Sequence, residues 1–304
     1  MEDELQKALK ERYTAAVDSF ISKIKDDPNV IAVIIYGSLA YDLLWEKSDI
    51  DMQMVIRDQQ LKNSSYSIVE DGITINVGLT TRSEFNRLLG GAIGGSMNHS
   101  MLAKGNMVYT TDESLYETFE NNREIGSDDI ALSAFQIANW ILHYYDKSQK
   151  WLKARKDTLY AQYFLCMAAE AVANMELCLH GEPSARDSIQ KACKLNPEIM
   201  KIYYHDTMSH HMSEYEILNA IENLDKYLEQ HLDIIKKPVI EFMSDQQIKT
   251  VTLISKHFHM DSHVISGLFD YLCDKGILEK VSQMIRITPK SKLAVEELGY
   301  LYIP

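Results

Sequence analysis

Cysteine is scarce in this sequence. Its 304 residues include four cysteines, none of them in a C-x-x-C pair, so zinc binding and thioredoxin-like redox chemistry have no support. They are Cys166, Cys178, Cys193 and Cys273. Buried, reduced thiols are the expected state, which is consistent with a cytoplasmic protein.

Basic residues are outnumbered by acidic ones. Lys and Arg total 31 against 44 Asp and Glu, so the formal net charge at pH 7 is −13. A general nucleic-acid binder usually carries a basic face, so this balance argues against nucleic acid as a partner. It would suit a cationic substrate, although an acidic cytoplasmic protein of any function can have the same composition.

No apolar run predicts a membrane span. The most apolar long stretch, residues 159–179, is interrupted by Glu170 and Glu176 and is typical of a core helix. The first residues, MEDELQKALKERY, are charged and have a helical pattern, so they do not predict a signal peptide. We therefore expect no membrane partner and a cytoplasmic location.

Three regions of different pattern follow one another, as a chain of this length suggests. We expect domains over residues 1–122, 123–240 and 241–304. The first mixes strands and helices, with a buried strand NVIAVIIY and a hairpin of SSYSIV and ITINVGL around the turn EDG. The second has helical spacing throughout, which predicts a helical bundle.

The third region predicts helices over 245–258 and 262–275, a short hairpin over 277–288 and a last helix over 289–299. This order resembles a winged helix. Over residues 243–304 its basic and acidic residues are equal in number, which is poor for phosphate-driven binding. A packing or dimerisation module is therefore favoured over a DNA reader, and a homodimer is left open.

Residues 36–55, YGSLAYDLLWEKSDIDMQMV, combine two features. Gly37-Ser38 follows a buried strand, and Asp49 and Asp51 lie at the next, alternating strand. Residues two apart on a strand face the same side, so the two carboxylates should project together and could hold Mg²⁺. A Gly-Ser turn can bring N–H groups and a hydroxyl to a phosphate. The stretch therefore predicts a metal site beside a phosphate cradle, as nucleotidyl transfer requires.

Each half of this motif has a simpler explanation when it is taken alone. An Asp-x-Asp pair is usually a solvated strand face, and Gly-Ser is usually a turn. The combination and its spacing favour a nucleotidyltransferase site over a chance match or a relic of one.

The motif resembles that of the polymerase-beta-like nucleotidyltransferase superfamily, Gly-Ser followed by Asp-x-Asp/Glu on the next strand. Within it, YGSL, SDIDM, ITINVGLTTRSEFNRLL and YDKSQKWLKARK resemble kanamycin nucleotidyltransferase, an aminoglycoside adenylyltransferase, over about residues 15–235. The expected fold class is therefore α+β. It comprises an N-terminal nucleotidyltransferase domain with a mixed sheet and helices, a substrate-binding helical bundle, and the C-terminal winged-helix-like unit.

The resemblance implies roles for residues of the first domain. Asp49 and Asp51 would be catalytic residues that hold Mg²⁺. Ser38 and the Gly37 backbone would contact the β- and γ-phosphates of a nucleoside triphosphate, and Ser48 would belong to the same nucleotide-binding site.

The resemblance also implies roles in the second domain. Asp146 falls at the position of the general base that deprotonates the acceptor hydroxyl, and Lys150 falls at a nucleotide-contacting lysine. From the residues alone, the two form an i,i+4 pair on one helix face, for which a surface salt bridge is the favoured interpretation.

One position departs from the family pattern. Asn76 stands where the superfamily usually has a third metal-binding carboxylate. An amide carbonyl can still ligate a metal but carries no charge, so Mg²⁺ should be held more weakly. Either the enzyme works with a neutral third ligand, or the protein binds nucleotide without turning it over.

The expected function is Mg²⁺-dependent transfer of NMP, with AMP from ATP favoured, to a hydroxyl of a small molecule such as an aminoglycoside-like antibiotic. A nucleotide-binding regulator with a winged-helix-like module is the alternative. A toxin–antitoxin-type transferase acting on RNA or protein is disfavoured by the absence of basic patches. His99 could contact substrate or nucleotide, although a loop histidine without such a role is favoured.

Overall fold

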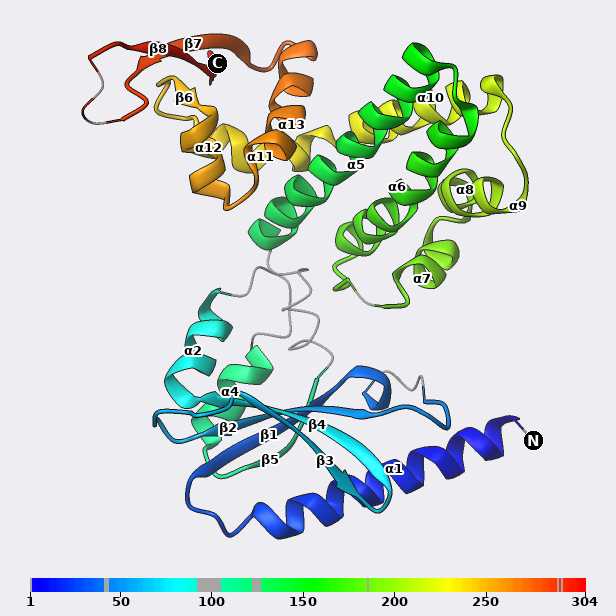
Figure 1. The fold of residues 1–304 in the computed structure, drawn as a ribbon, viewed down its shortest axis with the longest axis vertical. Helices are drawn as coiled ribbons and strands as arrows, with labels where there is room; N and C mark the ends of the chain where they lie inside the picture. Colours follow the sequence, from blue (N-terminus) through cyan, green and yellow to red (C-terminus); the bar gives the residue numbers. More distant parts are fainter. Residues whose placement is uncertain are drawn as a thin grey trace. The chain divides into compact units, whose positions relative to one another are not determined.

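The chain forms two compact units. The structure, a computed structural model, describes residues 2–40, 44–91, 105–121, 127–184, 186–288, 290 and 292–304. The first unit spans Met1–Ile125 and the second Gly126–Pro304 (Figure 1). Among the described residues, no helix is both long and apolar enough to cross a membrane.

A five-stranded mixed sheet forms the centre of the first unit. Its strand order is β3-β4-β2-β1-β5, in which β2 and β4 are parallel and the other neighbours are antiparallel. The strands are β1 (Val30–Tyr36), β2 (Ile50–Ile56), β3 (Ser65–Glu70), β4 (Ile73–Thr81) and β5 (Asn106–Thr110). This sheet and the helices of both units confirm the predicted α+β class.

Helices pack on both faces of this sheet. They are α1 (Glu2–Ile24), α2 (Arg82–Gly91) and α4 (Glu113–Asn121). Alternation along β2 places Met52 in the core on the α1 side, which also contains Val17, and Val55 in the core on the opposite face, which also contains Phe85. Because both faces of the central strands are covered, β1 is apolar along almost its whole length, as predicted.

The predicted hairpin is confirmed. β3 pairs with β4 antiparallel, with Glu70 opposite Ile73. The two residues between them, Asp71 and Gly72, have φ angles of 49° and 75°. Positive φ at both central residues is typical of the type I′ turn, whose twist matches that of the paired strands.

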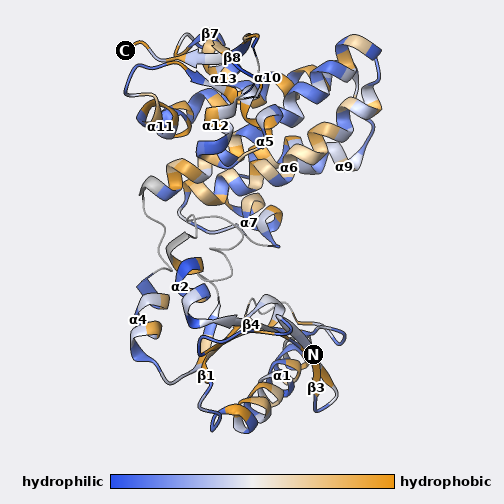
Figure 2. Ribbon diagram, turned by 60° about the vertical axis from the view of Figure 1, so that its left-hand side comes forward, coloured by the Kyte–Doolittle hydropathy of each residue, from blue (hydrophilic) through white to orange (hydrophobic). Residues whose placement is uncertain are grey.

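The second unit begins with a bundle of helices. They are α5 (Ser127–Arg155), α6 (Thr158–Leu179), α7 (Ser188–Leu195), α8 (Pro197–Met200), the π-helix η2 (Lys201–Asp206), α9 (Thr207–Ser209), α10 (Glu214–Gln230) and α11 (Leu232–Phe242). Hydrophobic and hydrophilic residues mix along α5, as expected of a helix buried on one side (Figure 2). α6 is the predicted core helix, and its first turn is capped by the Asp157 side chain, which accepts from the Tyr160 N–H.

The C-terminal elements correct part of the sequence prediction. They are β6 (Lys249–Thr250), α12 (Val251–Phe258), α13 (Ser262–Asp274), β7 (Glu279–Ile285) and β8 (Val295–Leu301), and their sheet has the order β6-β8-β7. The helix predicted over 289–299 is wrong, because 295–299 belong to strand β8. The hairpin predicted within 277–288 is also wrong, because β7 pairs with β8 instead.

Packing explains why a strand forms there. Tyr300 on β8 is fully buried, and its hydroxyl donates to the Asp270 carboxylate on α13. At Gly299, a Cβ would lie 2.9 Å from Ile248 Cγ2 and 3.1 Å from the Lys249 carbonyl oxygen. The absence of a side chain therefore lets β6 approach β8 closely.

One hydrophobic core extends from the bundle into the C-terminal elements. Phe135 of α5 packs on Phe258 of α12, with ring centroids 4.4 Å apart, and α13 packs on α5. The further division of this unit at residue 240 stays a prediction.

Candidate active site

A glycine turn at the end of β1 forms one wall of the site. η1 (Gly37–Leu39) follows Tyr36, and Gly37 has a φ of +74°. A Cβ at Gly37 would lie 2.6 Å from the Asp51 Oδ2 atom. Both the backbone conformation and the close approach of the Asp51 carboxylate therefore require glycine at this position.

The two predicted carboxylates lie at the start of β2. Asp49 immediately precedes the strand, and Asp51 lies opposite Tyr36 of β1 and Asn76 of β4. Ile50 and Met52 are fully buried in the core against α1. Since side chains alternate along a strand, Asp49 and Asp51 project to the opposite face. Burial and the nearby Asp51 charge raise the pKa of the Tyr36 hydroxyl.

Asn76 joins the two carboxylates. Its Nδ2 donates to Asp49 Oδ2 at 2.6 Å and to Asp51 Oδ1 at 3.4 Å. Its Oδ1 accepts from the Ser67 hydroxyl at 2.9 Å. In this orientation the amide nitrogen faces the carboxylates, and a metal-ligand role for Asn76 stays a prediction. Metal binding by Asn76 would require its side-chain amide to flip, so that the oxygen faces the carboxylates. The Ser67 hydroxyl permits this flip because it can accept a hydrogen bond as well as donate one.

Ser48 closes the turn that leads into the carboxylates. Its Oγ accepts from the Trp45 N–H at 3.1 Å, and its carbonyl oxygen accepts from the Tyr13 hydroxyl at 2.6 Å. The second bond ties the turn to α1. These contacts give Ser48 a structural role, while its predicted contact with nucleotide stays a prediction.

The donor set at this site fits Mg²⁺. Two carboxylates meet at one amide nitrogen, so their oxygens are close enough to share a hard cation. No group of three His, Cys, Asp or Glu side chains suited to a metal occurs in the described part of the chain. An ion here would therefore complete its shell with neutral oxygens, water or phosphate.

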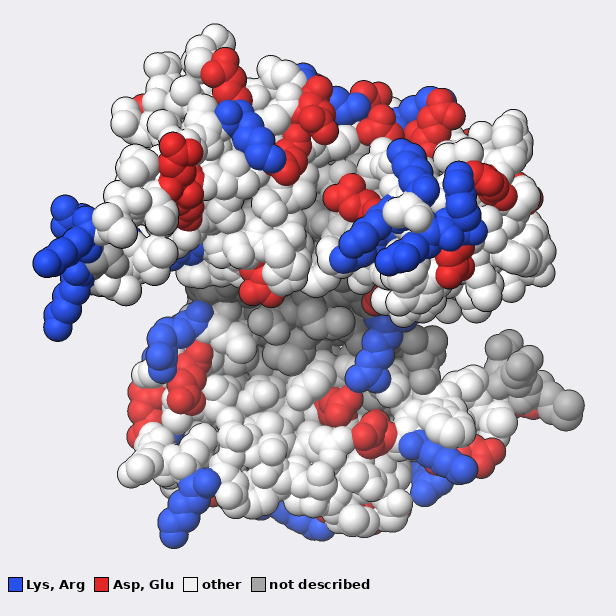
Figure 3. Space-filling view, turned by 45° about the horizontal axis from the view of Figure 1, so that its top comes forward, with Lys and Arg blue, Asp and Glu red and all other residues white. Residues whose placement is uncertain are grey.

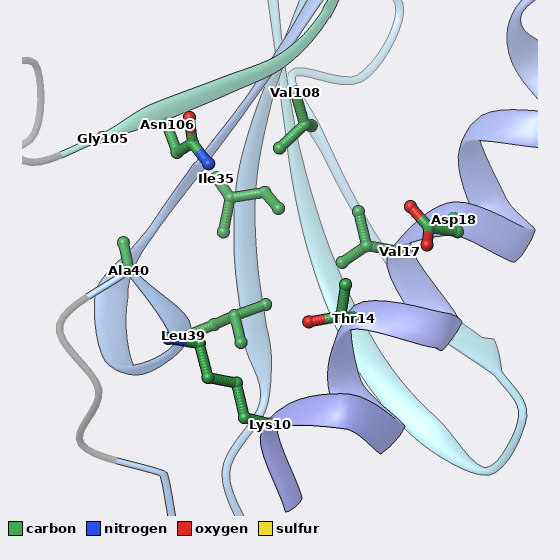
Figure 4. Close-up of a pocket in the computed structure, with 10 residues that line it drawn as sticks. All are labelled: Lys10, Thr14, Val17, Asp18, Ile35, Leu39, Ala40, Gly105, Asn106 and Val108. Atoms are coloured by element: carbon green, nitrogen blue, oxygen red, sulfur yellow. The ribbon is translucent and has the colours of Figure 1, made fainter. Parts of the chain in front are cut away.

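A cavity of about 350 Å³ lies beside η1 on the α1 side of the sheet (Figure 4). Val17, Ile35 and Leu39 give it an apolar wall, and Asp18 and Asn106 are among its polar residues. His99, considered above as a possible contact, lies outside the described residues.

Asp146 and Lys150 lie on α5 of the second unit, one helical turn apart. Both are described residues, and no ion pair joins them, so the surface salt bridge considered above is not formed. The Asp146 carboxylate lines a pocket between α5, α10 and α13. Burial, and to a smaller extent Asp270 and Asp274, raise the pKa of Asp146, while Lys147 opposes them.

Sequence reasoning missed Ser67 and the second-unit pocket residues Tyr271 and Asp274. The Ser67 contact could have been found, because a two-residue turn at 71–72 sets a register in which Ser67 faces Asn76. The pocket residues had no such local signal, because α13 meets α5 only through packing.

Comparison with known proteins bears on both units. Residues 19–114 match the family model described as polymerase beta, nucleotidyltransferase, and this range includes the glycine turn, both carboxylates and Asn76. The first unit thus carries a nucleotidyltransferase-like domain. No curated protein matches the chain in sequence.

Almost the whole chain is similar in fold to a solved structure. This is the crystal structure of a nucleotidyltransferase-like protein from Exiguobacterium sibiricum 255-15. The match has a TM-score of 0.65 and 16% identity, and it covers 95% of this chain and 99% of that one. At this identity the likeness shows the fold alone.

Proposed function

We propose that the protein is a Mg²⁺-dependent nucleotidyltransferase that moves NMP, with AMP from ATP favoured, from a nucleoside triphosphate to a hydroxyl of a small molecule. The observation that carries the proposal is the meeting of Asp49 and Asp51 on Asn76 beside the Gly37 turn. It lies within a domain that matches nucleotidyltransferases in sequence.

The residues of the first unit divide the work between metal and phosphate. Asp49 and Asp51 would hold Mg²⁺, which when bound neutralises phosphate charge and orients the attacking and leaving oxygens. Gly37 leaves its backbone open to a phosphate, and the Ser38 hydroxyl would donate to a phosphate oxygen. The hydrogen bonds of Ser48 fix the backbone just before Asp49, the first of the two carboxylates.

Asn76 sets the charge of the site. With a neutral amide in place of a third carboxylate, the site carries one negative charge fewer, so Mg²⁺ should bind more weakly than at three carboxylates. The amide also holds the two carboxylates together, since its single nitrogen donates to both.

The acceptor side of the proposal rests on α5. A general base acts best when its pKa lies near the working pH, and the pKa of Asp146 is raised in this direction. Lys150 is exposed one turn further along and would contact the nucleotide. The acidic composition suits a cationic acceptor such as an aminoglycoside. Further parts of the proposal are a cytoplasmic location and no membrane partner.

Transfer of label from a nucleoside triphosphate tests the proposal. Purified protein with Mg²⁺ would be screened with each labelled triphosphate against a panel of hydroxylated acceptors, aminoglycosides included. We expect transfer by the native protein and its loss in Asp49→Asn and Asp51→Asn. Asp26→Asn, which removes an exposed carboxylate from the same unit, should transfer normally. Equal transfer by all four proteins would refute the assignment.

A nucleotide-binding regulator is the second candidate. It is favoured by one observation, the neutral Asn76 whose amide nitrogen faces both carboxylates. Mg²⁺-dependent triphosphate binding that needs Asp49, without transfer to any acceptor, would support it.

The C-terminal elements do not favour nucleic acid as the regulator's target. The face of α13 that carries Asp270 and Asp274 turns toward α5 and α10 and carries negative charge. Both acidic and basic side chains lie on the face drawn in Figure 3. A packing or dimerisation role therefore remains our proposal for these elements, with a homodimer left open.

A further inference from the structure

The outward side of α6 lacks the charges that an exposed helix usually carries. From Thr158 to Asn174 the sequence has a single charged residue, Glu170. The inward side of α6 belongs to the core of the second unit, where Leu165 and Val172 are fully buried. A helix with so few charges on any side is normally buried all round, because apolar side chains gain free energy when they leave water. The outward side of α6 therefore lacks a covering partner.

Large apolar and aromatic side chains fill this outward side. Tyr163 is 49% exposed, and Tyr160 and Met167 are each 40% exposed. On the neighbouring helix α5, Trp140 is 46% exposed and lies with its ring centroid 6.3 Å from that of Tyr144. A large exposed patch of this kind is typical of a surface that another molecule covers. We call it the α5–α6 face, and its members are Trp140, Tyr144 and Trp151 of α5 and Tyr160, Tyr163 and Met167 of α6.

The rings of α6 continue those of α5, because the two helices run antiparallel. Trp151 contacts Tyr160 near the turn that joins the helices, with ring centroids 4.5 Å apart. At the far ends, the Cys178 thiol of α6 donates to the Ile130 carbonyl oxygen of α5. Tyr160 in turn stacks on Tyr163, with centroids 5.6 Å apart and ring planes 8° from parallel. The aromatic side chains therefore form one continuous patch across both helices.

Opposite charges lie toward the two ends of the α5–α6 face. Arg155 follows Trp151 by one helical turn on α5, and Glu170 lies ten residues beyond Tyr160 on α6. At a rise of 1.5 Å per residue, Arg155 and Glu170 are about 20 Å apart along the helices. Both side chains are exposed, and neither forms an ion pair within the part of the chain that the structure describes. Each charge is therefore free to pair with another molecule.

A pocket of about 150 Å³ lies beside Glu170 on this face. Trp140, Tyr144 and Met167 line it together with Glu170. Burial and then the Glu170 charge raise the pKa of the Tyr144 hydroxyl, so the carboxylate lies close to that ring. Aromatic rings beside a carboxylate suit an arginine guanidinium, which can make a cation–π contact and a charge-assisted hydrogen bond at once.

We propose that the α5–α6 face binds the same face of a second copy of this chain. A two-fold axis that crosses the face near Tyr163, halfway between Arg155 and Glu170, brings Arg155 of each copy to the Glu170 pocket of the other. The same operation lays the aromatic side chains of the two copies against each other and forms a bundle of four helices. The proposal does not rest on nucleotide transfer, because every residue involved belongs to the second unit.

Other occupants fit this face less well. An anionic membrane surface would be repelled by Glu170 and by the net charge of −13. A helix of a different protein could cover the rings, but it would need a cation and a carboxylate at a matching spacing of about 20 Å. A second copy carries both charges at that spacing, and the two-fold symmetry places each opposite its complement.

Sedimentation equilibrium of the purified full chain over a range of concentrations tests the proposal. We expect a dimer of twice the 34.9 kDa chain mass that dissociates on dilution. Glu170→Arg and Arg155→Glu should each weaken the dimer about tenfold, because each places like charges opposite one another in two symmetric contacts. The double variant should recover most of the lost affinity, since reversal of both charges regenerates both pairs.

A matched pair of variants separates this face from other surfaces. Tyr163→Ser removes an aromatic ring at the proposed axis and should weaken the dimer about tenfold or more, because buried aromatic side chains dominate the energy of interfaces. Leu293→Ser removes an 82% exposed apolar side chain from the C-terminal elements and should leave the dimer unchanged. Because all of these side chains are exposed in the single chain, each variant should keep the native circular dichroism spectrum.

Three results would overturn the proposal. A native chain that stays monomeric at every concentration would mean that something other than a second copy covers the α5–α6 face. A dimer that survives Tyr163→Ser and both charge reversals, or that Leu293→Ser disrupts instead, would place the interface elsewhere. A double variant as weak as the single ones would exclude the pairing of Arg155 with Glu170 on which the two-fold arrangement depends.

Discussion

Gly37 and Asp51 are in such close contact that a Cβ on the glycine would lie 2.6 Å from a carboxylate oxygen of the aspartate. Gly37 also has a φ of +74°, which residues with side chains rarely adopt. The turn that would receive a phosphate and the carboxylate that would hold the metal are therefore fitted to each other.

Gly37→Ala should lower stability and displace Asp51. The backbone conformation alone costs about 1–3 kcal/mol for a residue with a side chain, and the clash adds to this cost. We expect a lower free energy of unfolding in denaturant and a loss of Mg²⁺-dependent triphosphate binding.

The hairpin glycine provides the control for this prediction. Gly72 also has a positive φ, of +75°, but nothing lies within 4 Å of its would-be Cβ. Gly72→Ala should therefore lose stability and keep triphosphate binding. If both variants lost binding equally, the contact between Gly37 and Asp51 would not matter for the site.

Asn76→Asp should make the first unit dependent on Mg²⁺ for full stability. The substitution replaces an amide that donates to Asp49 and Asp51 with a third carboxylate that repels both. Without metal we expect destabilisation of at least about 1 kcal/mol, from lost hydrogen bonds and like-charge repulsion. With Mg²⁺ we expect recovery and tighter metal binding than in the native protein.

Thermal unfolding over a Mg²⁺ titration measures both effects. Ser67→Ala, which removes only the bond to Asn76 Oδ1, should show no such dependence on Mg²⁺. Equal Mg²⁺ affinities in Asn76→Asp and the native protein would mean that residue 76 does not face the metal. Tighter binding without transfer to any acceptor would favour the regulator.

Glu70 should make the first unit sensitive to acid. The residue is 6% exposed and accepts from Lys23 Nζ at 2.6 and 2.8 Å and from the Ser19 hydroxyl at 2.6 Å. The Lys23 bond and then the Ser19 bond lower the pKa of Glu70 below its ordinary value of 4.5. Because the folded-state pKa is lowered, this stabilisation is present above pH 4.5 and is lost as the pH falls toward the folded-state value.

Denaturant unfolding at a series of pH values between neutral and about 3 checks this prediction. Glu70→Gln should be less stable than the native protein at pH 7, and the difference should shrink in acid. Glu11→Gln, on the exposed side of α1, should follow the native curve throughout. A constant difference between Glu70→Gln and the native protein across this range would assign the effect to packing instead.

Local patterns predicted the first unit well. The strand before Gly37, the Asp49–Asp51 alternation and the turn at Asp71-Gly72 each depend on a few neighbouring residues. The same patterns could not give the orientation of the Asn76 amide, because it follows from hydrogen bonds to Asp49, Asp51 and Ser67 on neighbouring parts of the sheet.

The second unit shows where sequence patterns fail. Residues 295–301 form a strand because β6 and β7 are available on either side and Gly299 permits close packing. The sequence of residues 295–301 alone does not show which strands lie on either side of it. The pocket between Asp146 and Asp274 likewise exists only because helices distant in sequence pack together, so the resemblance gave Asp146 a role but not its surroundings.

Asp146→Asn separates a catalytic role from a structural one. The pKa of Asp146 is raised above its ordinary value of 3.8, mainly by burial. A raised folded-state pKa means that stability is fully present below pH 3.8 and is lost as the pH rises through the folded-state value. Because Asp146 is exposed to solvent, which screens its charge, the ionised carboxylate weakens the native fold only slightly at neutral pH, and the neutral asparagine avoids this small cost.

We expect Asp146→Asn to unfold at no lower denaturant concentration than the native protein at pH 7, with the two curves converging toward pH 4. If Asp146 is the base, turnover should fall far more than triphosphate affinity, since the amide cannot accept the acceptor's proton. Asp233→Asn, which removes a 95% exposed carboxylate on α11 outside the pocket, serves as the control for both measurements. A variant that is less stable at pH 7 but transfers NMP at the native rate would show that Asp146 supports the fold instead. A residue that costs stability when ionised and is needed for turnover fits a catalytic group, because structural interactions seldom weaken the fold that contains them.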